Sequence, residues 1–94
     1  MKKYFIVSLC ENGILGGGIL ANDEAVTYCT GKVTVPDKFR RLRMEYNNIS
    51  SVSGGWIFIF PTVTINMKNG ESYKFVVFAK NKFINLLKEM GISE

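Results

Sequence analysis

The side chains that most often perform chemistry in enzymes are scarce in this sequence. Histidine is absent from the 94 residues, which excludes imidazole bases, Ser-His and Cys-His nucleophile pairs, and histidine-ligated metals. The two cysteines, Cys10 and Cys29, have neither the C-x-x-C spacing of a zinc or redox site nor the density of a disulfide framework. We therefore expect both to be small buried hydrophobic residues, and we expect no metal site and no cofactor.

Two further groups resemble functional motifs only in part. The glycine-rich segment Gly13–Gly18 lacks the Lys-Ser/Thr ending and the strand-loop-helix context of a phosphate-binding loop, so it indicates a bulged start of a strand. Asp23 and Glu24 are adjacent, and no further acidic cluster accompanies them, which favours a turn over a metal or acid-base site. With no nucleophile-base pair and no identifiable carboxylate pair, the sequence argues against an enzyme.

The positive charge of the chain is concentrated in one segment. Twelve Lys and Arg against eight Asp and Glu give a net charge of +4, and residues 32–43 contain five of the twelve cations. The candidates for binding an anionic partner are Lys38, Arg40, Arg41 and Arg43. The guanidinium groups of the three arginines suit phosphates or carboxylates. The alternative is that these charges mark an edge strand and prevent its aggregation.

A second candidate surface is the apolar run at residues 56–60. If the run is one strand, alternation directs Trp56, Phe58 and Phe60 to the core and leaves Ile57 and Ile59 outward. Trp56, Ile57 and Ile59 are then candidates for self-association, in which this edge pairs with a second copy or another chain. The alternative is a strand buried on both faces.

The elements that would position these residues are mostly short strands. Apolar runs rich in Val, Ile, Phe, Tyr and Thr recur between Gly, Asn and Asp clusters, which is typical of antiparallel strands. We expect a first strand at 4–9 and a hairpin formed by 16–21 and 25–29 around an Asn-Asp turn. The segment 39–46 alternates, with Leu42, Met44 and Tyr46 on its buried face.

The last hairpin and the helix are predicted in more detail. A two-residue turn would place the apolar sets of 63–67 and 73–77 on opposite faces of the sheet, so we predict a three-residue loop at 68–70 with Gly70 in the left-handed region. This loop pairs Ile65 with Tyr73 and Val63 with Phe75. From 80 to 90 the period changes to that of a helix, whose apolar face should plug the curled sheet. That face consists of Phe83, Ile84, Leu87 and Met90.

The predicted ends of this helix also follow from residue type. Asn81 could cap its start, since an Asn side chain accepts hydrogen bonds from the first free amides. Gly91 stands where a left-handed residue ends a helix, and Ile92 can fold back onto the last turn.

Several motifs resemble those of the GRAM and bacterial pleckstrin-homology-like domains. The segment 18–28 is similar to their first hairpin, Ile49-Ser50-Ser51-Val52 to their short I-x-x-V connection, and the stretch from Pro61 through Phe83-Ile84 to their closing hairpin and the start of their helix. The resemblance implies a seven-stranded half-open barrel with one C-terminal capping helix, which binds lipids or proteins and performs no catalysis. The hairpin 16–29 contains no Lys or Arg and has Ala25 where the family often has a basic residue, so inositol phosphate binding is not expected.

Together these observations predict a single mainly β domain over residues 1–94, with its N-terminal strand in 1–12 and its helix at about 80–90. The expected function is that of a cytoplasmic, non-catalytic binding module that acts through a protein partner or a homodimer, with peripheral contact to an anionic lipid surface as a secondary role. The alternative is a nucleic-acid-binding β-domain that uses the basic segment 32–43; we rank it lower because no RNP-like run occurs. No transmembrane segment is expected, because no run reaches the roughly 20 apolar residues that a spanning helix needs.

Overall fold

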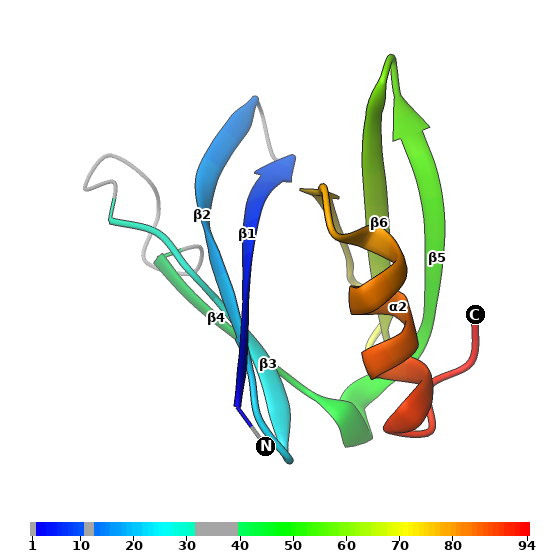
Figure 1. Ribbon diagram of the computed structural model, residues 1–94. Coiled ribbons are helices and arrows are strands. Elements are labelled where there is room, and N and C mark those ends of the chain that lie inside the picture. The colour runs from blue at the N-terminus through cyan, green and yellow to red at the C-terminus, as the bar shows by residue number, and fades with distance from the viewer. Residues whose placement is uncertain (1, 11–12, 32–39) are drawn as a thin grey trace.

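A computed structural model describes residues 2–10, 13–31 and 40–94. These residues form seven strands, a short 3-10 helix and a C-terminal α-helix (Figure 1). The bounds are β1 Lys3–Cys10, β2 Ile14–Ala21, β3 Ala25–Cys29, β4 Arg41–Glu45, η1 Tyr46–Asn48, β5 Ile49–Ile57, β6 Phe60–Met67, β7 Ser72–Val77 and α2 Lys80–Glu89.

The seven strands form one curled antiparallel sheet in the order β4-β3-β2-β1-β7-β6-β5. Two meanders, β1 to β4 and β5 to β7, are joined where β1 pairs with β7 and Leu9 lies opposite Phe75. The two edge strands, β4 and β5, follow each other in the chain through η1, and Figure 1 shows the two halves of the sheet facing each other. This architecture confirms the predicted half-open barrel of seven strands with one C-terminal helix.

The core lies between the two halves of the sheet and is closed by α2. Phe83 on α2 meets Phe5 of β1 edge to face, with ring centroids 5.0 Å apart. Deeper in the fold, the rings of Tyr28 and Phe75 lie 5.5 Å apart. The plug predicted for the helix is therefore confirmed, although the sequence pattern missed Leu86, which is also buried.

The predicted register of the β6–β7 hairpin is correct. Val63 lies opposite Phe75 and Ile65 opposite Tyr73, and Gly70 has a φ of 94°. The amide of Met67 donates to the carbonyl of Glu71 at 2.7 Å, which leaves three residues in the loop.

The end of α2 also follows the prediction, whereas its start does not. Gly91 has a φ of 89°, and the amide of Ile92 donates to the Leu87 carbonyl at 3.1 Å, which is the hydrogen bond of a Schellman motif. At the other end the N-cap is Ala79 and no side chain caps the helix. Asn81 is the second residue of the helix, so its predicted capping role is wrong.

The predicted first strand, first hairpin and alternating β4 are present. In the β2–β3 turn, the side-chain oxygen of Asn22 accepts hydrogen bonds from the amides of Glu24 and Ala25, as its residue type favours.

The prediction that both cysteines are buried is wrong at Cys29, which is exposed at the end of β3, and Cys10 is only half-buried. Among the described residues, no helix is long and apolar enough to cross a membrane.

Candidate binding surface

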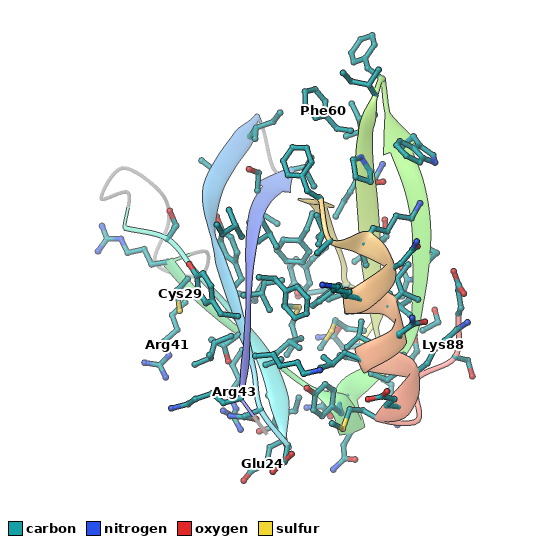
Figure 2. The ribbon with its side chains drawn as sticks, viewed as in Figure 1. Glu24, Cys29, Arg41, Arg43, Phe60 and Lys88 are labelled. Atoms are coloured by element: carbon teal, nitrogen blue, oxygen red, sulfur yellow. The ribbon has the colours of Figure 1, made fainter. Side chains whose placement is uncertain are left out.

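The described part of the basic segment, residues 40–43, leads into and lies on the edge strand β4, and part of its charge is neutralised. Arg43 lies within 3.4 Å of carboxylate oxygens of both Glu24 and Glu45. Arg41 is exposed on the same strand and pairs in register with Cys29; Figure 2 shows these arginines beside Glu24. Lys38 lies outside the described residues. Because β4 is an edge strand, its alternating charges fit the protection of an open edge.

The apolar run at 56–60 does not form one strand, contrary to the assumption on which its two faces were assigned. β5 ends at Ile57, β6 begins at Phe60, and Ile57 pairs directly with Phe60 across a two-residue turn. Phe58 in this turn has a φ of 54°. The prediction that Trp56, Phe58 and Phe60 face the core is therefore wrong, and the run is not buried on both faces either.

The β5–β6 hairpin and the residue after β7 instead carry a cluster of exposed large side chains, which we call the aromatic end. Its members are Trp56, Phe58, Ile59, Phe60 and Phe78, with exposed fractions of 65, 93, 81, 40 and 69%. The rings of Phe60 and Phe78 meet edge to face at 6.0 Å, so the residue after β7 joins the hairpin to the body of the fold. The hairpin extends past the start of α2 (Figure 1), which is why the helix does not cover it.

Lys80, at the start of α2, lies across the base of the aromatic end. Its Nζ is 4.9 Å from the centre of the Trp56 ring and donates to the carbonyl of Gly55 at 3.2 Å. Its stem passes over Gly54, where a Cβ would come within 2.6 Å of the Lys80 Cε. The glycine therefore permits a close approach of strand and helix that places a cation against the indole face.

A shallow hollow of about 480 Å³ opens between the aromatic end and the helix. Trp56, Pro61, Phe78, Lys80 and Lys82 all line it, so apolar and cationic groups share one surface. Of these, the sequence reasoning singled out only Trp56. A signal for Phe78 was present in the sequence, since it directly continues the apolar run Phe75-Val76-Val77.

A further group of exposed apolar side chains lies outside the aromatic end. On β1 and β2, the exposed apolar side chains include Tyr4, Ile6, Ile14 and Leu20. They lie on a paired, regular part of the sheet, where Tyr4 stands opposite Leu20 and Ile6 opposite Gly18. Tyr4, Ile6 and Leu20 are therefore neighbours on one face of the paired strands.

Two buried tyrosines connect segments of the fold through their hydroxyl groups. The Tyr28 hydroxyl donates to the Leu15 carbonyl at 2.6 Å, and the Tyr46 hydroxyl donates to the Asn22 carbonyl at 2.7 Å. Burial raises the pKa of both phenols above 10.0. Each phenol ties two distant segments together, so we assign both a structural role. Among the residues that the structure describes, no group of three or more Cys, Asp or Glu side chains could hold a metal ion.

Comparisons with known proteins identify the fold and no family. No protein-family model matches the chain, and no curated protein matches it in sequence. Among solved structures, the crystal structure of the C-terminal domain of an unknown protein from Leishmania infantum is similar, with a TM-score of 0.77. The match covers 94% of this chain and 80% of that chain at 9% sequence identity. Identity this low carries the architecture alone.

Proposed function

We propose that this protein is a non-catalytic binding module whose contact surface is the aromatic end. The observation that carries the proposal is the exposure of five large apolar side chains at one end of the fold, four on the projecting β5–β6 hairpin and Phe78 just after β7. Among them, Phe58 is 93% exposed and Ile59 is 81% exposed. Contiguous exposed apolar surface is costly in water and typically marks an interaction site. The strained turn at Phe58 adds support, because backbone strain is concentrated where function requires it.

The GRAM or pleckstrin-homology-like family assignment belongs to the same proposal. It rests on the sequence motifs, and the strand order and the helix at the open end of the sheet are compatible with it. Two free thiols, Cys10 and Cys29, fit a reducing compartment such as the cytoplasm.

The alternative contact surfaces have less support. In the basic segment, Arg43 already lies beside two carboxylates, which lowers its value for binding nucleic acid. Self-association through β5 has a specific observation in its favour, because β5 is an edge strand. Its first half is partly covered where the Val52 amide donates to the Ser93 carbonyl at 2.9 Å. Sedimentation velocity over a range of concentrations tests this alternative, which predicts a monomer-dimer equilibrium that Ile57→Lys abolishes.

Affinity capture with matched variants tests the main proposal. The wild-type chain, a Phe58→Ser/Ile59→Ser variant and an Ile6→Ser control would be immobilised and exposed to total extract and to membranes of the source organism. Ile6 is 76% exposed on β1, outside the aromatic end, and so matches Ile59 in residue type and exposure. We expect a bound protein or membrane fraction to be retained by the wild type and the control and lost from the double variant. Equal retention by all three chains would contradict the proposal.

A further inference from the structure

The charged groups around the aromatic end are distributed so as to favour one kind of partner. Lys80 and Lys82 flank the hollow beside Trp56 and Phe78. This combination of aromatic side chains with lysines immediately behind them matches the interface of a lipid bilayer, where indole rings lie at headgroup level and lysines face anionic headgroups.

The acidic residues that the structure describes lie toward the other end of the molecule. Asp23, Glu24 and Glu45 line one hollow together with Met90, the C-cap of α2. The ten residues of α2 span about 15 Å, which separates this acidic group from Lys80 at the start of the helix. Figure 2 shows the same separation, with Phe60 at one end of the fold and Glu24 at the other.

The remaining acidic residues in the described ranges follow the same division. Glu71 comes after the 68–70 loop, at the opposite end of β6 from Phe60. Glu89 is the last residue of α2, and Glu94 forms an ion pair with Lys88 near the end of the helix at 3.0 Å. The described acidic residues are therefore kept away from a negatively charged surface when the aromatic end faces that surface.

The shape of the aromatic end also discriminates between partners. It is the end of a hairpin that projects beyond its neighbouring elements (Figure 1), with Phe58 and Ile59 at the turn itself. A projecting tip can insert into the deformable apolar interior of a bilayer. A symmetric contact between two copies would instead bring Lys80 and Lys82 of both chains together, and their like charges would repel each other.

From these observations we infer that the aromatic end inserts into the interface of an anionic lipid bilayer, with Lys80 and Lys82 toward the headgroups. This inference rests on the proposed function and names its partner. It requires no headgroup pocket, since apolar insertion and general negative charge are sufficient for peripheral binding.

Vesicle binding tests the inference directly, because the chain has a single tryptophan and it belongs to the aromatic end. The full chain would be mixed at low salt with vesicles of phosphatidylcholine, with and without phosphatidylserine. We expect co-sedimentation with the phosphatidylserine vesicles, a shift of Trp56 emission to shorter wavelength, and quenching by brominated acyl chains. Added salt should weaken binding by screening the lysines.

Matched variants separate the contribution of apolar insertion to vesicle binding from the contribution of the lysine charges. Ile59→Ser should lower the partition coefficient about tenfold, which corresponds to about 1.4 kcal/mol, whereas Ile6→Ser should leave it unchanged. Lys82→Gln should lower it about fivefold, in line with the contribution of one lysine near an anionic surface. Lys68→Gln, in the loop at the far end of β6, should have no effect.

Two results would overturn the inference: no binding of the wild type to phosphatidylserine vesicles at low salt, or binding that Ile59→Ser leaves unchanged. If vesicles are not bound while a protein is captured in a manner that depends on Phe58 and Ile59, the membrane inference fails and the proposed contact surface stands. If neither vesicles nor proteins distinguish the aromatic-end variants from the Ile6→Ser control, both fail.

Discussion

Replacing Phe58 with glycine should make the fold more stable, although it removes a large apolar side chain. Phe58 has a φ of 54°, and no other non-glycine residue in the described ranges has a positive φ. Holding an L-residue with a Cβ in this region costs about 1–2 kcal/mol, whereas glycine adopts it without a clash.

The size of the effect follows from the exposure of the ring. Phe58 is 93% exposed, so its removal forfeits only about 15 Å² of apolar contact, or about 0.4 kcal/mol at about 25 cal/mol per Å². Glycine also gives the unfolded chain more freedom, which costs about 0.5–1 kcal/mol. The net expectation for Phe58→Gly is a gain of about 0.5 kcal/mol in the free energy of unfolding.

The neighbouring residue provides a matched control. Ile59 is also exposed, at 81%, but it is not among the residues with positive φ. Ile59→Gly should therefore lose about 0.5–1 kcal/mol, because it carries the entropic cost of glycine without relief of strain. The two glycine variants should differ by about 1–2 kcal/mol, in favour of Phe58→Gly.

Urea denaturation followed by far-ultraviolet circular dichroism measures this difference, and thermal denaturation provides a second estimate. For a domain of this size, each 1 kcal/mol corresponds to about 4–8 °C in Tm. If both variants are destabilised equally, or if Phe58→Gly is the less stable, the argument from turn strain is wrong. If Phe58→Gly is more stable than the wild type but no longer binds vesicles, Phe58 lowers the stability of the fold and is required for binding.

Four further results are expected. Gly17→Ala should destabilise the fold by about 1–3 kcal/mol in urea denaturation, because its Cβ would lie 2.4 Å from the Cys29 carbonyl oxygen and 2.9 Å from the Tyr28 ring. Gly16→Ala is the control, since its Cβ would meet no described atom within 4 Å, and it should cost less stability. Equal losses in the two variants would contradict the steric argument. Because burial raises the pKa of Tyr28 and Tyr46 above 10.0, the folded state keeps these protons longer than the unfolded chain; the contribution to stability is complete below pH 10 and is lost as the pH rises through the folded pKa values. Tyr46→Phe should reduce this alkaline loss of stability, measured as the urea midpoint against pH, and an unchanged slope would exclude Tyr46 as a source. Cys29 should react with a maleimide faster than Cys10 in the native protein, as their exposure indicates, and mass spectrometry of the alkylated peptides would detect the reverse order. Phe83→Ala should cost about 3–5 kcal/mol, since this fully buried ring packs on Phe5; a loss below about 1 kcal/mol would show that the helix does not plug the sheet.

The regular elements could be predicted because their signals are local. The register of the β6–β7 hairpin followed from the requirement that Val63, Ile65, Tyr73 and Phe75 share one face, which a two-residue loop cannot satisfy. The helix followed from a change of apolar period, and its end followed from Gly91. Its start could not be read in the same way, because Ala79 takes the N-cap position without a side-chain hydrogen bond.

The candidate site was predicted only in part. Trp56, Ile57 and Ile59 were selected because five large apolar residues follow one another, and four of these five belong to the aromatic end. Ile59 is exposed as predicted, but the core-facing orientation predicted for Trp56 was wrong. The error arose because the turn at 58–59 contains none of the residues that usually mark a hairpin. Arg41 and Arg43 were correctly placed together on the exposed face of one strand. The ion pair between Arg43 and Glu24 was missed, because these residues are 19 positions apart and alternation along one strand gives no information about such a contact.

The sequence by itself determined the class of the fold, since periods of two and of 3.6 residues and the left-handed glycines act over a few neighbouring positions. Only the tertiary structure decided which apolar residues remain in water. The helix extends from Lys80 to Glu89 and leaves the end of the β5–β6 hairpin beyond its reach, so the same Trp and Phe residues that would be buried in a longer core are exposed here. Exposure depends on what covers a residue from elsewhere in the chain, and for this reason the surface that we propose as functional is a property of the packing.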